Sequence, residues 1–200
     1  MPIDTKYLAT FEAGEYYHVY NRSHTNTKLF HEEKNYLHFL NLIRKHLVEY
    51  TELYAYCLIP NHFHLFIKIK ENLMKDESVD INKLISNQFR KLFIAFTNSI
   101  NKAYDMHGSL FETPFRRLKI DSESYFSQII FYIHANPIHH GICAKSEDYK
   151  HSSYLSILSD KPTLLKRKEV LEWFGVRKFF KKYHDIQMER FSTIPYEIES

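Results

Sequence analysis

Two histidines in the segment Pro60–Lys70 are the first residues of this chain whose type and spacing could do chemistry. The apolar residues recur at every second position, which is typical of a β-strand with one face against a core. His62 and His64 are two positions apart, so their side chains lie next to each other on the face that points away from that core. Two imidazoles on an open strand face can share one metal ion, since neutral imidazole is the commonest metal ligand in proteins. The pattern alone fits two exposed histidines without a ligand equally well. The apolar face consists of Phe63, Leu65, Ile67 and Ile69.

A tyrosine and an asparagine four residues apart form a second candidate pair, Tyr132 and Asn136. In a helix they lie about 40° apart around the axis and share one face, whereas His134 lies about 200° from Tyr132. Asn136 precedes Pro137, so we expect it at the helix end, where the backbone leaves the helical region. The pair could place a nucleophile beside a metal ligand. A core tyrosine and a helix-terminal asparagine are the alternative interpretation.

The segments that must position these residues follow the order β-α-β-β-α-β-α. Strands are expected at Glu15–Ser23, Glu52–Ile59, His62–Lys70 and Leu110–Ile120, and helices at Glu32–Tyr50 and Ile81–Tyr104. A further helix begins near Ser122 and is ended by Pro137 and Gly141, and a Lys-rich helical tail follows from about Lys166. The first six elements match the split β-α-β pattern. We therefore predict an α+β fold, a ferredoxin-like antiparallel sheet (βαββαβ) with helices on one face and a C-terminal helical tail.

The composition is that of a soluble globular domain. With 200 residues, of which 44% are hydrophobic and 26% charged, the chain can bury a core without a disulfide or a metal, and disordered, collagen-like and coiled-coil classes are excluded. Cys57 and Cys143 are far apart and fit buried thiols in a reducing compartment. No signal peptide and no run of ~18 apolar residues is present. The sequence predicts a cytoplasmic protein without a membrane segment.

Several motifs occur in a fixed order along the chain. A Pro-Asn-His-hydrophobic-His strand from Pro60 is followed by a long helix, by the segment HGSLFETPFRR from His107, and by YIHANP from Tyr132 ahead of a glycine. This order resembles the HUH single-tyrosine transposases, and most closely the REP-associated tyrosine transposases, which are related to the IS200-like insertion-sequence enzymes. The resemblance covers Tyr16–Tyr154, about 140 residues.

The resemblance implies a catalytic domain that cleaves and rejoins single-stranded DNA, at hairpin sites, through a 5′-phosphotyrosine. It implies that Tyr132 is the nucleophile and that His62, His64 and Asn136 are the metal ligands. Insertion-sequence members often have Gln at the third ligand position, and Asn is one methylene shorter. The domain would span residues 1–160, with a basic helical extension at 161–200.

The chemistry of such a reaction explains these residue types. A tyrosine hydroxyl has a pKa near 10 and needs assistance at neutral pH. A metal ion on two imidazoles and an amide oxygen would act as a Lewis acid at the phosphate, and this ligand set suits Mg²⁺ or Mn²⁺, with Zn²⁺ or Co²⁺ tolerated by imidazole. A phosphotyrosine conserves bond energy, which agrees with the lack of a GxxxxGK[ST] nucleotide-binding loop.

Basic residues concentrate in the second half of the chain. Lys83–Lys119 contains seven basic and two acidic residues, and Lys161–Ser200 contains nine basic and six acidic ones, although the net charge is only +3. Basic surface interleaved with aromatic residues favours a polyanion with bases that stack, and a solvated charged face is the plainer alternative. The candidate DNA contacts are Arg22, Phe66, Lys68, Arg90, Arg116, Arg117 and Lys119.

Two other functions fit parts of the pattern. A non-catalytic ferredoxin-like module could bind structured single-stranded nucleic acid, but it would not need His62, His64 and Tyr132 together. A metal-dependent hydrolase would want carboxylates near the histidines, and the first one after His64 is Glu71. We expect single-stranded DNA with hairpins as the partner, with a homodimer as a further candidate assembly.

Overall fold

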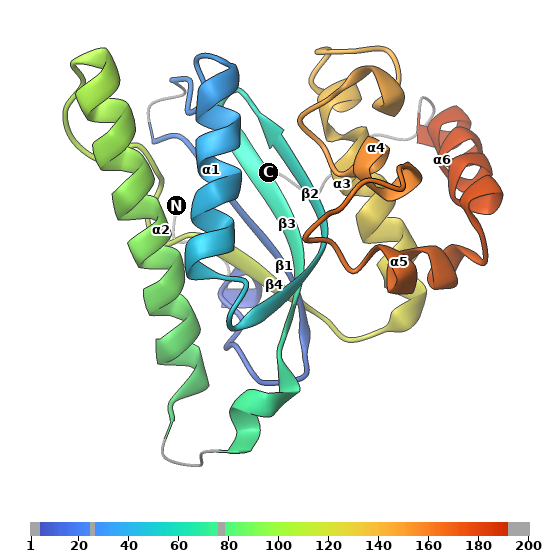
Figure 1. The fold of residues 1–200 in the computed structure, drawn as a ribbon, viewed down its shortest axis with the longest axis horizontal. Helices are drawn as coiled ribbons and strands as arrows, with labels where there is room; N and C mark the ends of the chain where they lie inside the picture. The colour runs from blue at the N-terminus through green and yellow to red at the C-terminus, as the bar shows by residue number, and fades with distance from the viewer. Residues whose placement is uncertain (1–4, 25–26, 76–78, 192–200) are drawn as a thin grey trace.

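A single four-stranded sheet forms the centre of the molecule. The computed structural model describes residues 5–24, 27–75 and 79–191 (Figure 1). The strands lie in the order β2-β3-β1-β4, and every neighbouring pair is antiparallel. This is the order of a split β-α-β fold, so the prediction of a ferredoxin-like α+β fold is confirmed. The strands are β1 (Tyr16–Arg22), β2 (Thr51–Ile59), β3 (His62–Ile69) and β4 (Arg116–Ile120).

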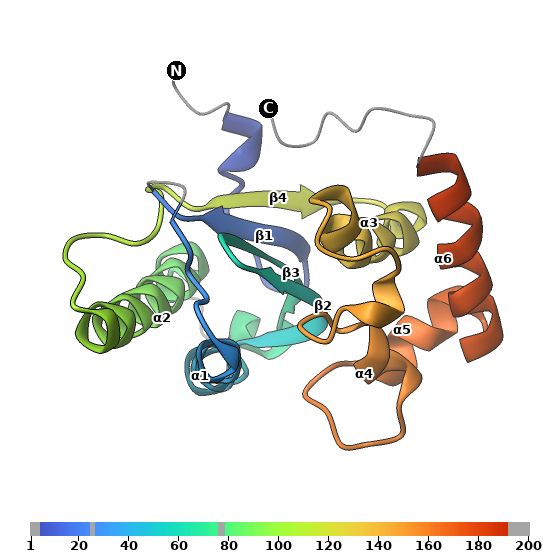
Figure 2. The same cartoon turned by 90° about the horizontal axis from the view of Figure 1, so that it is seen from above.

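Helices α1 (Glu33–His46) and α2 (Ile81–Tyr104) cover one face of the sheet (Figures 1 and 2). The start of α2 is fixed by Asp80, whose carboxylate accepts the Lys83 backbone N–H at 2.9 Å. Between these helices and the sheet lies an aromatic core, in which Phe39 stands 5.0 Å from Phe63 between ring centroids. Phe63 is fully buried there. The predicted placement of the two helices on one face is therefore correct.

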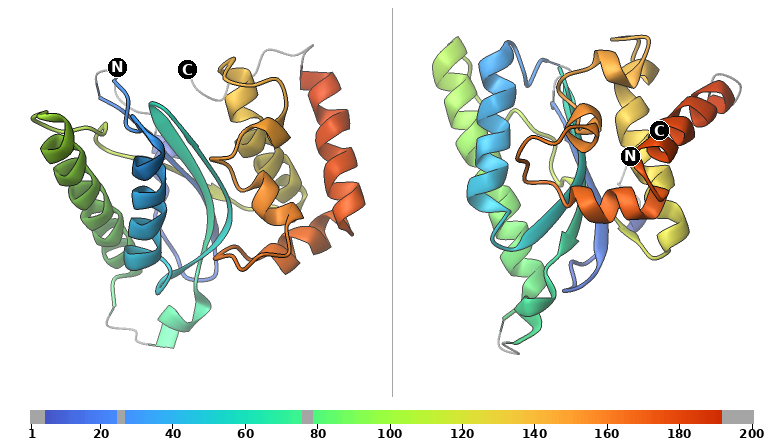
Figure 3. Two further views of the ribbon diagram at one scale, coloured as in Figure 1. Left: turned by 45° about the horizontal axis from the view of Figure 1, so that its top comes forward. Right: turned by 45° about the vertical axis from the view of Figure 1, so that its right-hand side comes forward.

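Helix α3 (Phe126–His139) covers the opposite face, as the views in Figures 2 and 3 agree. Its first residue, Phe126, packs against Tyr16 and Phe66 of the sheet, with ring centroids 4.3 and 5.4 Å apart. Tyr16 and Phe66 lie on the same face of the sheet as the histidines, each two residues from one of them. Burying these aromatic side chains stabilises the packing of α3 on this face. The prediction that the histidine face of the sheet is open is therefore wrong.

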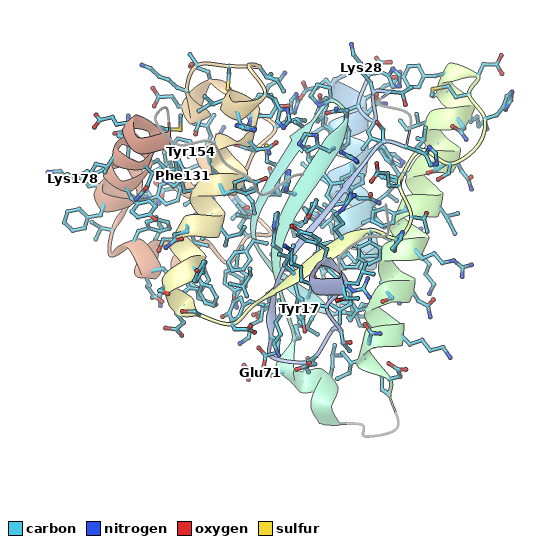
Figure 4. The ribbon with its side chains drawn as sticks, turned by 180° about the vertical axis from the view of Figure 1, so that it is seen from behind. Tyr17, Lys28, Glu71, Phe131, Tyr154 and Lys178 are labelled. Carbon is cyan, nitrogen blue, oxygen red and sulfur yellow. The ribbon has the colours of Figure 1, made fainter. Side chains whose placement is uncertain are left out.

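Three further helices form an outer layer on α3. They are α4 (Tyr154–Leu158), α5 (Arg167–Phe174) and α6 (Arg177–Phe191). Figure 4 shows Phe131 and Tyr154 in the layer between α3 and α6, with Lys178 at its outer edge. Phe131 lies 5.6 Å from the His184 ring, and Tyr154 lies 5.5 Å from the Phe180 ring. The tail is helical as predicted; residues 192–200 of that prediction lie outside the described residues.

A buried chain of hydrogen bonds ties α6 to α3. His184 Nδ1 donates to the Phe180 carbonyl at 2.9 Å, so its Nε2 accepts from His134 Nδ1 at 3.0 Å. His134 Nε2 in turn accepts from the Ser153 hydroxyl at 2.7 Å. Every member of this chain is satisfied with both rings neutral. Burial lowers the pKa of His184 to about 4 and that of His134 well below its usual range.

Four short 3₁₀ turns complete the described chain, at η1 (Thr5–Tyr7), η2 (Glu71–Lys75), η3 (Glu123–Tyr125) and η4 (Ser146–Asp148). Both cysteines are free thiols, Cys57 buried and Cys143 partly so. Among the described helices, none is long and apolar enough to cross a membrane.

Three predicted boundaries are wrong. The helix expected at Glu32–Tyr50 ends at His46. The strand expected at Leu110–Ile120 begins only at Arg116, because Pro114 lacks the N–H that a strand ladder needs; before it, Phe111 makes one isolated bridge to Ser23. The helix α3 does not stop before Pro137 but continues to His139. Its last turn is closed by the His140 N–H, which donates to the Asn136 carbonyl at 3.1 Å.

Candidate active site

The two histidines, His62 and His64, lie on strand β3 and point to the face of the sheet that α3 covers. His62 and His64 pair with Arg22 and Tyr20 of the neighbouring strand β1, which places them in the middle of the sheet. Their exposed fractions are 6% and 0%, so the imidazoles are enclosed and not solvated. Their rings stand nearly perpendicular, with centroids 5.1 Å apart. Spacing by two residues thus puts both side chains into the same enclosed space.

Helix α3 delivers the tyrosine and the asparagine to the same space. Because the helix runs through Pro137, Asn136 keeps helical backbone and stands one turn above Tyr132. The Tyr132 ring lies edge-on to His64 with centroids 5.6 Å apart, and it is 6% exposed. Asn136 Oδ1 lies 3.0 Å from His62 Nε2. The four residues that the sequence singles out for chemistry therefore converge.

Hydrogen bonds behind the two imidazoles fix their orientation. Asn61 Oδ1 lies 2.9 Å from His62 Nδ1, and a carbonyl oxygen only accepts, so His62 Nδ1 carries a proton. On the other ring, His64 Nδ1 lies 2.9 Å from His18 Nε2. Each ring is thus held through Nδ1, and each would hold a metal through Nε2. Such supporting partners orient the ligands of metal sites in general.

The pair formed by His62 and Asn136 fits a cation. A neutral His62 with its proton on Nδ1 presents a lone pair at Nε2, and the atom that faces it at 3.0 Å is a carbonyl oxygen, also an acceptor. Two acceptors this close repel unless a proton or a cation lies between them. The Asn136 amide nitrogen is buried and makes no hydrogen bond to the described residues, and its oxygen faces His62. Two imidazole nitrogens and one amide oxygen match a divalent ion that completes its shell with water or phosphate oxygens. Within the described residues, no three His, Cys, Asp or Glu side chains form a metal-binding group.

Two residues of the site carry no signal in the sequence. His18, which alternates with two tyrosines and fits a structural role, is 2% exposed and supports His64. His140, just past the end of α3, packs its ring 4.7 Å from that of His62. The pairing of β1 with β3 brings His18 to His64, and no local pattern encodes that pairing. Only the number of histidines in the sequence, 13, could have suggested that more of them belong to the site.

Two of the predicted basic residues lie beside the site. Arg22 pairs directly with His62 across the strands, and Arg116 pairs with Tyr20, which pairs with His64. Both arginines bind the carboxylate of Glu112, at 2.6 and 2.8 Å. Burial would raise the pKa of Glu112, but the hydrogen bonds from the two arginines outweigh it and lower that pKa. The pair forms a cationic rim held by one carboxylate.

The other predicted contacts are dispersed. Phe66 is fully buried among aromatic side chains, so its ring belongs to the core and has no face for a base. Lys68 binds Glu71 at 2.6 Å, and Lys119 binds Glu12 at 2.8 Å. Arg117 points to the opposite side of β4, where it covers Phe11. Arg90 is exposed on α2, across the sheet from the histidines. Alternation along β4 thus separates Arg116 from Arg117.

Comparison with known proteins supports the fold. No protein-family model and no curated protein sequence matches this chain. A solved structure, that of a REP-associated tyrosine transposase bound to a REP hairpin, is similar with a TM-score of 0.58 and 17% sequence identity. The similarity covers 77% of this chain and 86% of that one. At this identity the match shows a shared fold.

Proposed function

We propose that this protein is a metal-dependent transposase or endonuclease of the HUH type, which cleaves and rejoins single-stranded DNA through a 5′-phosphotyrosine. The observation that carries the proposal is the cluster itself: the Tyr132 ring against His64, with His62 Nε2 3.0 Å from Asn136 Oδ1. Structural burial alone does not require two histidines, an asparagine and a tyrosine in one enclosed space. The shared fold with a tyrosine transposase adds support.

The reaction exchanges one phosphodiester for another. The Tyr132 hydroxyl loses its proton and its oxygen bonds to phosphorus, while the bond from phosphorus to the 3′ oxygen breaks. The 3′ oxygen takes up a proton and leaves as a 3′ hydroxyl, and the 5′ phosphate stays on the tyrosine. Attack by a 3′ hydroxyl on the phosphotyrosine reverses the step, so rejoining needs no nucleotide cofactor.

His62, His64 and Asn136 would hold Mg²⁺ or Mn²⁺. Such an ion polarises the phosphoryl oxygen and stabilises the charge that develops there. His18 and Asn61 keep the two rings in place behind it. Arg22 and Arg116 stand where a phosphate of the same strand could replace the Glu112 carboxylate as their partner.

The proposed substrate class is single-stranded DNA with hairpins, and the similar transposase is bound to a REP hairpin. The proposed catalytic residues lie within 1–160, and the extension from 161 supports α3 through the chain of hydrogen bonds that ends at His184. Action on DNA and the two free thiols are consistent with a cytoplasmic location. A homodimer is the candidate assembly.

The test is covalent capture of the DNA. Protein is incubated with Mn²⁺ and end-labelled single-stranded hairpin oligonucleotides, and adducts are resolved by denaturing electrophoresis. The wild type should form an adduct on the 5′ phosphate of the cut, and Tyr132→Phe should form none while binding DNA as before. Chelation of the metal should also abolish the adduct and leave most of the binding, because affinity comes largely from counterion release.

The matched control is Tyr125→Phe, which removes a hydroxyl from an exposed tyrosine just before the same helix. Its adduct yield should equal that of the wild type. An adduct of normal yield from Tyr132→Phe would refute the assignment. If the wild type binds hairpin DNA but forms no adduct with Mg²⁺, Mn²⁺, Zn²⁺ or Co²⁺, the result would instead support the non-catalytic binding module.

A further inference from the structure

A cavity of about 550 Å³ borders the candidate nucleophile. Tyr132, His18 and the N-terminal turn η1 line one end of it, and it continues between α3 and the edge strand β4 to Tyr125. Its volume lies in the range of small-molecule sites, about 300–1,000 Å³. The cavity therefore gives the enclosed Tyr132 a connection to a space that can hold a ligand.

Tyr125 stands at the end of the cavity away from Tyr132, whereas Tyr7 lies near the histidines, with its ring centroid 6.5 Å from that of Tyr20. Tyr125 is 58% exposed, although it directly precedes a buried helix. Tyr7 of η1 lines the same space, and the ammonium of Lys6 lies 4.7 Å from the centre of its ring. An exposed aromatic ring offers a face on which any base can stack. Tyr125 precedes Tyr132 by seven residues, or about 10 Å along the helix, so a strand with its phosphate at Tyr132 would pass Tyr125 within its next nucleotides.

The polar groups of the cavity suit a base better than a phosphate. Gln128 is exposed on α3 between the two tyrosines, and its amide can both donate to and accept from the edge of a base. Of the two lysines that line the cavity, Lys119 is ion-paired with Glu12 and Lys6 lies over the Tyr7 ring, and the carboxylate of Asp121 lines the same wall. The remaining wall, with Leu118, Ile120 and Ile129, is apolar.

We propose that this cavity holds a base of single-stranded DNA next to the scissile phosphate, with Tyr125 as its stacking partner and Gln128 at its edge. The proposal rests on the proposed function, since that function places the phosphate at Tyr132. Tyr125 acts in binding and takes no part in bond exchange. Removing its ring should therefore weaken binding of DNA with bases and leave the chemistry intact at saturating DNA.

The test measures binding of dT20 and of a 20-mer in which every site is abasic, by fluorescence anisotropy in the Tyr132→Phe background. With the Tyr125 ring present, dT20 should bind about tenfold more tightly than the abasic strand, from one stacked base. Tyr125→Leu should reduce this preference several-fold, and Tyr125→Phe should retain it. Phe179→Leu is the matched control, because Phe179 is 55% exposed on α6 outside the cavity. It should retain the preference in full.

A second measurement identifies the contact directly. A 20-mer carrying 5-iodouracil is irradiated with the protein, and the crosslinked peptide is identified by mass spectrometry. Crosslinks at Tyr125 support the proposal, whereas crosslinks confined to other residues overturn it. An unchanged preference in Tyr125→Leu overturns it as well. Because both measurements use a variant that cannot cleave, failure of the cleavage assay and failure of this site are separate results.

Discussion

The two faces of the sheet are built from alternate residues of the same strands, yet they bury different chemistry. On the face under α1 and α2, Phe63 is enclosed by other aromatic rings. On the face under α3, its neighbour His64 is just as buried but contacts His18, Tyr20 and Tyr132. Burial is equal, but Phe63 is surrounded by aromatic rings, whereas His64 contacts groups that can bind a metal or donate a proton. The comparison separates residues that stabilise the fold from residues that are buried for chemistry.

The largest effect on stability should come from the first face. Phe63→Ala removes a fully buried ring and should lower the free energy of unfolding by about 3–5 kcal/mol. Urea unfolding followed by circular dichroism measures this. The matched variant is His64→Ala, which should cost less stability but reduce adduct formation by about 10³-fold, since metal stabilisation of the transition state contributes several kcal/mol. Equal losses of stability and of adduct in both variants would contradict the division between the faces.

The outer layer, where α6 packs on α3, should make stability depend on pH. His184 is neutral in the fold with a pKa of about 4, whereas an unfolded histidine has a pKa near 6.5. Below about pH 6.5 the unfolded state therefore binds a proton that the folded state does not, and stability falls until about pH 4. The full loss from His184 is about 3 kcal/mol, and His134, whose pKa is lowered in the same direction by burial, adds to it.

The measurement is urea unfolding of the wild type and of His184→Gln between pH 7.5 and pH 4.5. The variant should show a flatter decline than the wild type, because it lacks the titrating ring. Carboxylates such as Glu112 titrate equally in both proteins, so the difference between the two curves isolates the histidine chain. Parallel curves would show that the buried chain does not govern the acid sensitivity.

The smallest expected effect tests whether a buried residue next to His64 supports metal binding or only packing. His18→Phe keeps a planar ring on the strand but removes the hydrogen-bond partner of His64 Nδ1. Loss of such a supporting partner should lower Mn²⁺ affinity about 10- to 100-fold. Isothermal titration calorimetry measures it, and His18→Gln, which offers an amide oxygen, should recover part of the affinity. An unchanged Mn²⁺ affinity in His18→Phe would show that His18 acts only in packing.

Several parts of the site follow from local rules. Alternation along β3 puts His62 and His64 on one face, and the helical repeat puts Tyr132 and Asn136 on one face, with no knowledge of the fold. The predicted bounds of α2, Ile81–Tyr104, agree with the structure because an amphipathic stripe and a capping Asp80 mark them. The basic residues were harder to place, because a charge run does not say which face of a strand each charge takes. Arg116 and Arg117 are adjacent in sequence and lie on opposite faces.

The sequence by itself determined the order of the elements and the two pairs of residues that share a face, since these depend on neighbours in the chain. The ferredoxin-like class was predicted because that order matches a known pattern. Only the tertiary structure decided that α3 closes over the histidines, that β1 brings His18 to His64, and that a cavity leads to Tyr132. Strand pairing and helix docking join residues 46 to 74 positions apart, as His18 with His64 and His62 with Asn136. Such contacts are selected by the combined burial of many side chains, so no short segment of the sequence encodes them.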